Sequence, residues 1–325
     1  MSLPPVDLAS PDAVERLFLD AASANFDAAC RNGSVDEINA PGVLIATGDL
    51  HDNPIHFARV LELAAPPEAP PESPPEAPPE TSPPGAPPQE APPTHVTLHE
   101  VIHSGRLING VDLSHRALAR VAQAKLHAPE RVHTLLANHE LSQIVGMGVV
   151  KDGVRMKDAF NEGVGYVFSE EAPRVLRAIE AFIRSMPLAL LCNRGGPDCV
   201  LCAHSLPGAD LLDRFDHTVL DRALTEEDYT PRKGAAHIMV WGRGHPPEHL
   251  EALAQRWGVR LFLLGHEKAE QGWRFVEPNA VVLNSDHEHG AALEIDLGAV
   301  PECPPPEPHE GSARGWRFHR LTPSE

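Results

Sequence analysis

Apolar runs separated by short polar stretches recur along the chain, and they alternate between strand-like and helix-like patterns. Short apolar runs bounded by turn residues are typical of buried strands, whereas longer amphipathic stretches are typical of helices. The pattern predicts helices over about residues 10–30, 54–64, 113–127, 170–186 and 246–257. It predicts strands over residues 42–47, 95–103, 131–136, 188–192, 199–203, 235–244, 259–264, 274–276, 280–285 and 291–297.

The order of these elements predicts the fold class. Helices and strands alternate over most of the chain, and the last elements are short strands. Such alternation is typical of a layered α/β fold whose functional site lies where strands end. We therefore predict an α/β protein with its chemistry at the strand ends.

A proline-rich segment interrupts the pattern at residues 66–93, where 14 of the 28 residues are proline and none is aromatic. This composition cannot form a packed core, so we expect a disordered insertion with partly polyproline II character. A strand-like pattern resumes directly afterwards, which favours an insertion over a linker between domains. The segment is either an inert loop extension or a docking site for a proline-recognition partner.

The sequence divides into three parts. Residues 1–40 are expected to form an N-terminal helical extension, and residues 41–300 one domain that contains the insertion. Residues 301–325 include the stretch PECPPPEPHEG, so we expect a C-terminal tail there.

Polar side chains gather where the predicted strands end. Carboxylate, amide and imidazole groups at neighbouring strand ends are suited to converge on one site. Oxygen and nitrogen donors without a thiolate favour a divalent ion such as Mn, Fe or Zn. The residues in question are Asp49, His51, Glu100, His103, Asn138, His139, Glu140, His204 and His266.

Composition and charge narrow the choice of partners. The chain has 46 acidic and 27 basic residues and a formal charge of −19, which argues against a nucleic-acid partner held by bulk electrostatics. No apolar stretch reaches the roughly 18–20 residues that span a membrane. The N-terminus lacks the basic and apolar regions of a secretory signal, so we expect a cytoplasmic protein without a membrane partner.

The five cysteines are few and odd in number, which is typical of a reducing compartment. Cys199 and Cys202 form a single CxxC without a second pair. We interpret them as buried cysteines on a core strand, with a zinc ribbon as the alternative.

The ordered motifs GDLHDN, ANHE, CAHS and LLGHE resemble those of the calcineurin-like metallophosphoesterases. They are most similar to the phosphoprotein phosphatase branch of that family, as a bacterial-type member with a divergent second motif. The resemblance covers about residues 42–297 and includes WGRG at 241–244 and QGWRF at 271–275. It implies a four-layer α/β sandwich of the metallophosphoesterase type, with two mixed β-sheets flanked by helices.

The resemblance also implies a centre of two divalent ions, Mn, Fe or Zn, that share a hydroxide. Asp49 and His51 match the ligands of the first metal, and Glu100 falls at the bridging position. The ligands of the second metal match Asn138, His204 and His266.

Other residues match the family's catalytic and phosphate-binding positions. His139 matches the histidine that protonates the leaving alkoxide, and Arg243 matches an arginine that binds phosphate alongside Asn138. In such a centre two ions position the phosphoryl group for in-line attack, and a neighbouring histidine adds general-acid catalysis worth roughly 10²–10⁴-fold.

The second motif departs from the family pattern, because HEVIHSG stands where the family has GDxxDRG. Glu100 replaces the bridging aspartate, and His103 replaces the aspartate that orients the catalytic histidine. Ser104 replaces a phosphate-binding arginine, with Arg106 two residues further on. The alternative for this segment is a polar strand end in which His99 takes the ligand role.

Together these features predict a phosphomonoesterase acting on phosphoserine or phosphothreonine in proteins, or on a small phosphate ester. One alternative is a hydrolase of nucleotides or dinucleoside polyphosphates. The other is a degenerate pseudophosphatase that binds metal without turnover.

Overall fold

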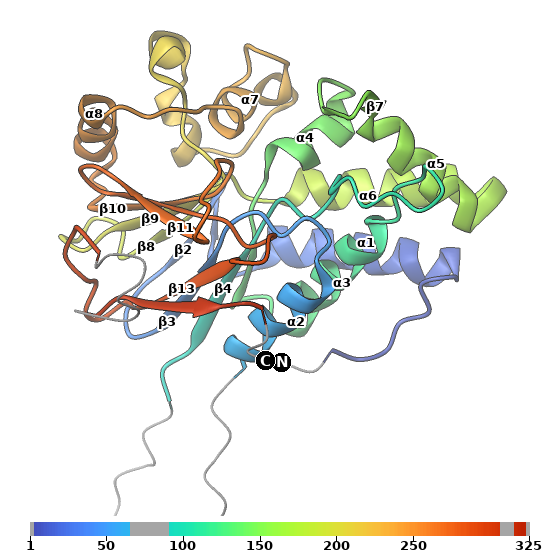
Figure 1. Cartoon of the computed structure of the whole chain (residues 1–325), viewed down its shortest axis with the longest axis horizontal. Helices are drawn as coiled ribbons and strands as arrows, with labels where there is room; N and C mark the ends of the chain where they lie inside the picture. The colour runs from blue at the N-terminus through green and yellow to red at the C-terminus, as the bar shows by residue number, and fades with distance from the viewer. Residues whose placement is uncertain (1–2, 66–90, 306–314, 323–325) are drawn as a thin grey trace, which may run out of the picture.

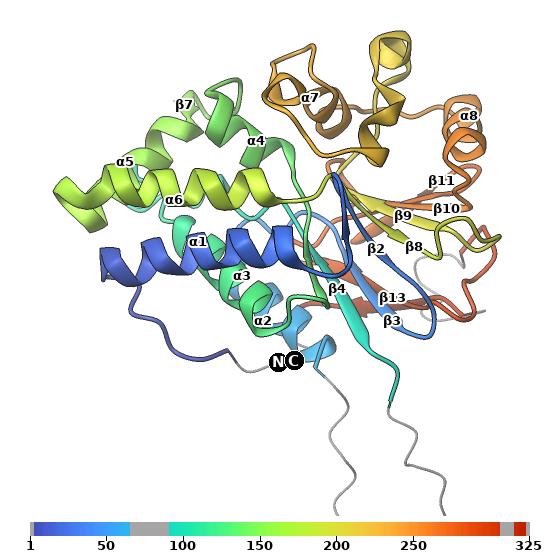
Figure 2. The same ribbon diagram turned by 180° about the vertical axis from the view of Figure 1, so that it is seen from behind.

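The computed structural model describes residues 3–65, 91–305 and 315–322. Two β-sheets pack face to face in the middle of the molecule, and helices cover their outer sides (Figure 1). The expected α/β sandwich with two mixed sheets flanked by helices is confirmed. Seen from behind, α1, α3 and α6 lie together beside the sheets, and α8 lies next to β9 and β10 (Figure 2).

The large sheet is mixed. The pair β8/β9 is the antiparallel hairpin expected around RGGPD, whereas β9, β10 and β12 run parallel. The strands, in order across the sheet, are β1 (Arg31–Asn32), β2 (Val35–Ile38), β8 (Ala189–Cys192), β9 (Val200–Ala203), β10 (Leu261–Leu264), β12 (Ala280–Leu283) and β11 (Trp273–Val276).

The small sheet contains three parallel neighbours, β3, β4 and β5, so their carboxyl ends meet at one edge. β13 and β14 continue this sheet in antiparallel pairs on the other side of β3. Its strands, in order, are β14 (Arg317–Arg320), β13 (Ala291–Asp296), β3 (Val43–Thr47), β4 (Thr94–Leu98) and β5 (Val132–Thr134).

The two sheets touch where β3 ends. Asp49 forms isolated backbone bridges with His99 of the small sheet and with Asn284, which follows β12 of the large sheet. Gly48 permits this approach, because a Cβ there would lie only 2.0 Å from the Leu283 carbonyl oxygen. The carboxyl ends of strands from both sheets therefore converge on one place.

Helices form because their apolar positions recur at helical spacing and their first turns are capped. In α1 the Ser10 hydroxyl accepts a hydrogen bond from Ala13 N at 3.3 Å, as the sequence predicts. α1 packs on α6, where the rings of Phe18 and Phe182 lie 5.7 Å apart. The α-helices are α1 (Pro11–Asp27), α2 (Pro54–Leu63), α3 (His115–His127), α4 (Asn138–Val145), α5 (Met156–Phe168), α6 (Ala172–Ser185), α7 (Ala235–Val240) and α8 (Pro247–Trp257).

Short elements complete the described chain. A separate hairpin pairs β6 (Val150–Lys151) with β7 (Val154–Arg155) between α4 and α5. Four 3₁₀ helices lie within the described residues, at Ser169–Glu171, Ala209–Arg214, His217–Asp221 and Glu226–Tyr229.

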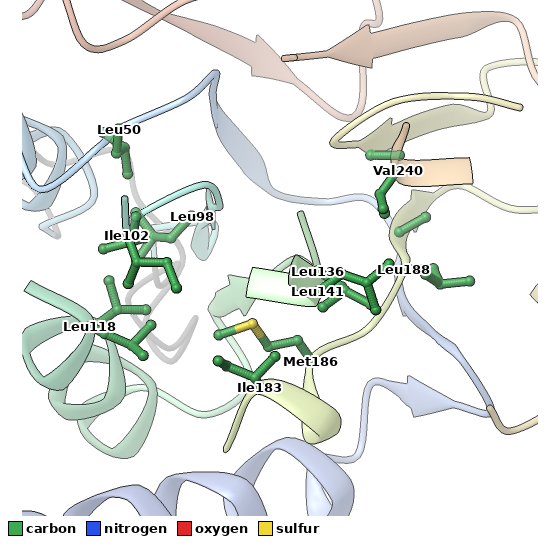
Figure 3. Packing of buried hydrophobic residues seen from close by; sticks show 14 of the residues in the cluster. Leu50, Leu98, Ile102, Leu118, Leu136, Leu141, Ile183, Met186, Leu188 and Val240 are labelled. Atoms are coloured by element: carbon green, nitrogen blue, oxygen red, sulfur yellow. The ribbon is translucent and has the colours of Figure 1, made fainter. Parts of the chain in front are cut away.

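The apolar core reaches directly beneath the strand-end loops. Figure 3 shows Leu50 and Ile102, from the loops after β3 and β4, beside Leu98 and Leu118. Leu50 and Ile102 are fully buried, so core packing fixes the backbone of both loops. The polar residues next to them in sequence are held in place by the same packing.

Two segments differ from the expectation at the chain ends. In the N-terminal part, β2 pairs with β8 of the large sheet, so residues 1–40 are not merely a helical extension. In the expected tail, Arg317–Arg320 pairs with β13, and Trp316 is fully buried. Apolar burial and strand pairing thus extend the fold beyond residues 41–300.

A third difference concerns residues 235–244, which were expected to form a strand. Ala235–Val240 forms the short helix α7, and all six of its residues are buried. A short apolar run carries no periodicity that separates a buried helix from a buried strand.

Cys199 and Cys202 are buried and free, as expected for cysteines of a core strand. Most of the segment 66–93, with its expected disorder and its proline-recognition partner, lies outside the described residues. Within the ranges that the structure describes, no helix has both the length and the apolar character needed to cross a membrane.

Candidate metal centre

All six residues expected to bind metal lie together where the two sheets meet. Each comes from a segment that directly follows a strand or opens a helix. Asp49 and His51 follow β3 and Glu100 follows β4 in the small sheet. The other three are Asn138 at the start of α4, His204 after β9 and His266 after β10.

Four donor atoms converge on one point. His204 Nε2 lies 2.6 Å from Asn138 Oδ1, 2.9 Å from Glu100 Oε2 and 2.9 Å from His266 Nδ1. A single imidazole nitrogen cannot satisfy three neighbours of this kind by hydrogen bonding. His266 Nε2 is buried and has no hydrogen-bond partner among the described residues. The chemistry of this donor set fits a divalent cation.

A second set of donors faces the other oxygen of Glu100. His51 Nε2 lies 3.1 Å from Glu100 Oε1, and His139 Nε2 lies 3.7 Å from the same atom. The two carboxylate oxygens of Glu100 therefore face two different groups of imidazoles. Both groups could hold a metal ion, and Glu100 belongs to each of them.

Asp49 joins the centre through the GH segment after β10. Its Oδ1 accepts a hydrogen bond from His266 N at 2.8 Å and lies 3.6 Å from His204 Nδ1. Gly265 leaves room for this contact, since a Cβ there would lie 2.5 Å from the same oxygen. A residue larger than glycine at position 265, in the motif LLGHE, would therefore clash with the Asp49 carboxylate.

His99 orients His204. The Nε2 of His99 lies 2.8 Å from the carbonyl oxygen of Thr47, so this nitrogen carries the proton and donates. Its Nδ1 is then an acceptor for Nδ1–H of His204 at 3.2 Å. This assignment leaves the lone pair of His204 Nε2 free for a metal, as is usual for ligand histidines with an ordered partner.

The backbone of the centre is strained. His51, Glu100, His103 and His266 all adopt positive φ values, of 42°, 47°, 59° and 68°. Such conformations cost roughly 1–3 kcal/mol each in residues other than glycine and gather at functional sites. The loops are tied together by Leu50 N and His51 N, which both donate to the carbonyl oxygen of Glu100, at 3.1 and 2.7 Å.

Glu140 holds the loop that carries Glu100. Its Oε1 accepts hydrogen bonds from Val101 N at 2.8 Å and Ile102 N at 3.2 Å. Burial raises the pKa of Glu140 to about 7, and the Glu100 carboxylate adds to the rise. The glutamate of ANHE therefore has a positioning role in this structure.

The electrostatics of the centre depend on Glu100. Burial raises the pKa of Asp49 to about 6, and the nearby Glu100 carboxylate adds to this rise. Burial also disfavours charge on Glu100, but His139, His204 and His51 hold its pKa well below the usual range. Burial opposes charge on His51 too, yet Glu100 raises the pKa of that histidine to about 9. The Glu100 carboxylate thus stabilises positive charge next to it, and it would stabilise a bound cation for the same reason.

His139 and His103 lie next to one another, with ring centroids 5.6 Å apart. The Nδ1 of His139 faces the carbonyl oxygen of Ile102 at 3.3 Å, which gives this ring its orientation. The Nε2 of His103 instead lies 3.1 Å from Gln143 Oε1. The orienting contact implied for His103 is therefore made by the backbone of Ile102.

The two arginines expected to bind phosphate have different surroundings. Arg243 Nη1 donates to the carbonyl oxygen of His266 at 2.7 Å, which places a cation beside the centre. Arg106 donates to the carbonyl oxygen of His51 at 3.0 Å and pairs with Asp286 and, at 3.5 Å, with Asp52. Arg106 thus stabilises the loop that carries His51 by linking it to Asp286.

Three residues in or near the candidate centre have contacts that the sequence alone did not predict. His99 entered only as an alternative to Glu100, and Glu140 only as part of a polar turn. Lys151 did not enter at all, although Asp-Gly between two Val-containing pairs, VKDGVR, is a hairpin signal that could have placed it.

The fold is similar to those of two solved phosphatases. A protein serine/threonine phosphatase from Saccharomyces cerevisiae, described as similar to human phosphatase PP5, matches with a TM-score of 0.65 and 14% identity, covering 97% of this chain and 91% of that chain. A cold-active protein-tyrosine phosphatase of a psychrophilic Shewanella species matches with a TM-score of 0.51 and 12% identity, covering 82% and 78%. No protein-family model and no curated protein sequence matches. At these identities the similarity shows the fold.

Proposed function

We propose that the protein is a metal-dependent phosphoester hydrolase with two divalent ions, Mn, Fe or Zn. The observation that carries this proposal is that the two oxygens of Glu100 face two separate groups of nitrogen and oxygen donors. A carboxylate placed in this way is suited to bridge two ions. The proposed ligands are Asp49, His51, Glu100, Asn138, His204 and His266.

Two bound ions supply Lewis-acid activation and can bring the pKa of a water ligand from 15.7 to about 7. The chain's own residues supply ligation, charge balance and proton transfer. Glu100 and Asp49 contribute negative charge to balance the cations. His139 is proposed to protonate the leaving oxygen, with the neighbouring ring of His103 packed beside it.

The protonation state of His139 depends on the substrate. Burial lowers the pKa of His139 to about 3, so its ring is neutral in the free protein. With Nδ1 directed at the Ile102 carbonyl, Nε2 is the site that takes up a proton. A phosphate ester close to Nε2 raises this pKa, because an anion favours the imidazolium form. When the substrate binds, His139 Nε2 is proposed to take up a proton from solvent, which it then gives to the leaving oxygen.

Arg243 and Asn138 are proposed to bind the phosphate oxygens. Arg243 Nη1 bonds the His266 carbonyl and Nη2 faces His266 Nδ1 at 3.4 Å, which leaves three of the five N–H groups of the guanidinium for phosphate. Arg106 was expected to share this role, but it would first have to leave its ion pair with Asp286.

The proposed substrates are phosphoserine or phosphothreonine in proteins, or related small phosphomonoesters. This assignment rests on the motif resemblance and on the fold shared with a serine/threonine phosphatase. The fold is also similar to that of a protein-tyrosine phosphatase, so a substrate panel must include phosphotyrosine.

The test combines metal analysis with that panel. Elemental analysis of the purified protein should find about two divalent ions per chain, and an aryl phosphate and phosphoserine, phosphothreonine or phosphotyrosine peptides should be hydrolysed faster than dinucleoside polyphosphates. Asp49→Asn and His204→Ala should lose metal and activity together, while His127→Ala, which changes an exposed histidine of α3, should lose neither.

Two outcomes would overturn the proposal in different ways. Full metal occupancy in the Asp49→Asn/His204→Ala double variant would disprove the ligand assignment. Two bound ions in the wild type without turnover of any phosphate ester would make the protein a pseudophosphatase.

A further inference from the structure

The hairpin β6–β7 belongs to neither the large nor the small sheet, so its role is not explained by core formation. Its two strands pair Val150 with Arg155 and Lys151 with Val154. The turn is Asp152-Gly153, with φ of 50° and 80°, and positive φ at both positions is characteristic of the tight hairpin turn. An isolated two-stranded hairpin is at best marginally stable, so this one depends on contacts with the rest of the domain.

Lys151 makes such a contact. Its Nζ donates a hydrogen bond to the carbonyl oxygen of His103 at 2.6 Å. Its Cδ lies 3.5 Å from the position that a Cβ on Gly105 would occupy, so the lysine stem runs along the loop after Glu100. The hairpin therefore holds a half-buried ammonium group at the loop that forms one wall of the centre.

The charge of Lys151 acts on the groups of the centre. Burial lowers the pKa of Lys151, whereas the carboxylates of Glu100, Asp286, Asp49 and Asp112 act in the opposite direction. Four acidic groups from separate segments thus lie near one ammonium group.

Lys151 is also available for a ligand. In the described part of the chain it forms no ion pair, in contrast to Arg106, which pairs with Asp286 and Asp52. An ammonium group has three donors, and the His103 carbonyl uses one of them. Two donors and a full positive charge remain, which suit an oxyanion.

We propose that Lys151 binds the phosphate group of the substrate, on the side of the centre formed by the loop of His103 and Gly105. This inference rests on the proposed function, and it assigns to Lys151 the phosphate contact expected of Arg106. Arg243, which bonds the His266 carbonyl, holds the phosphate from the segment after β10.

The test separates charge from structure with two substitutions. Lys151→Gln keeps a donor for the His103 carbonyl and removes the charge, whereas Lys151→Arg keeps the charge. Lys233→Gln, at an exposed position, is the matched control. For each metal-loaded protein, calorimetry measures the Kd of inorganic phosphate, steady-state kinetics on an aryl phosphate gives kcat and KM, and elemental analysis and thermal unfolding report metal content and stability.

Lys151→Gln should weaken phosphate binding and lower kcat/KM by roughly 10- to 100-fold, the effect of losing a hydrogen bond to a charged group. Metal content and thermal stability should stay close to those of the wild type. Lys151→Arg should bind phosphate more tightly than Lys151→Gln, and Lys233→Gln should match the wild type.

The failure of this inference can be distinguished from that of the proposed function. Phosphate binding by Lys151→Gln equal to that of an active wild type would overturn the inference alone. A wild type that binds phosphate through Lys151 without hydrolysing any ester would overturn the hydrolase assignment alone. A third outcome would make Lys151 a structural residue. In that case Lys151→Gln would lose stability and metal, but after reloading with metal it would bind phosphate as tightly as the wild type. Lys151→Arg would also keep the wild-type phosphate affinity.

Discussion

His204 Nε2 lies 2.9 Å from Glu100 Oε2, although these residues follow strands of different sheets, β9 and β4. The candidate centre therefore depends on the packing of the two sheets against each other. The single carboxylate of Glu100 faces His204 with Oε2 and His51 with Oε1.

The first prediction is that Glu100→Gln lowers metal affinity at both positions. The substitution keeps the side-chain shape and removes the negative charge that balances two cations. The loss should exceed the roughly 10- to 100-fold cost of losing a partner outside the ligand shell. Titration with Mn²⁺ or Zn²⁺ measures it, and loss of only one equivalent would show that Glu100 binds a single ion.

The second prediction concerns His99, which accepts from His204 Nδ1–H and donates to the Thr47 carbonyl. His99→Leu should weaken metal binding about 10- to 100-fold, because His204 loses the partner that fixes its tautomer and ring orientation. Excess metal should restore two ions per chain. If one equivalent were lost even at saturating metal, His99 would be a ligand, as in the alternative reading of HEVIHSG.

The sequence was sufficient to predict which residues converge at the candidate centre, because the candidate ligands follow apolar strands. Parallel strands such as β3 and β4 end at the same edge, so Asp49 and Glu100 were expected to converge. The roles of adjacent residues could not be read in the same way. His99 and Glu100 are neighbours; Glu100 adopts a positive φ, and its Oε1 is the atom that lies 3.1 Å from His51 Nε2.

Short elements were the main source of error in the fold. Ala235–Val240 is an apolar run whose six residues are all buried, so its pattern carried no period. Arg317–Arg320 pairs with the preceding strand β13, but it follows the stretch PECPPPEPHEG, whose composition predicted a tail. Lys151 sits on a two-residue strand, and its place at the centre depends on the His103 carbonyl.

The third prediction tests His139 as a general acid. His139→Gln should lower kcat by roughly 10²–10⁴-fold on a phosphoserine peptide, whose alkoxide leaving group needs a proton. The loss should be much smaller on 4-nitrophenyl phosphate, whose leaving group is stable as an anion. Equal losses on both substrates would contradict this role. A fall in metal content would instead make His139 a ligand, since its Nε2 lies 3.7 Å from Glu100 Oε1.

A buried ionic contact between residues outside the candidate centre also joins the two sheets. Asp36 of β2 accepts hydrogen bonds from Arg31 Nε and from His133 Nδ1 of β5, both at 2.8 Å. The carboxylate of Asp36 is fully buried. The Lys125 ammonium group favours its ionised form, and the Asp36 charge in turn raises the pKa of the Cys30 thiol. Burial opposes ionisation, but His133, Arg31 and Lys125 hold the pKa of Asp36 below its usual range.

The fourth prediction is that Asp36→Asn lowers the free energy of unfolding at pH 7 by roughly 3–5 kcal/mol, the cost of breaking a buried ion pair. Because the folded pKa is lowered, this stabilisation is present above the unfolded pKa of about 3.9 and is lost as the pH falls towards the folded pKa. The difference between wild type and variant should therefore shrink by about 1.4 kcal/mol per pH unit below pH 4. Urea unfolding at several pH values measures it, with Asp213→Asn at an exposed position as the control. A difference that stayed constant down to pH 3 would show that the charge of Asp36 does not join the sheets.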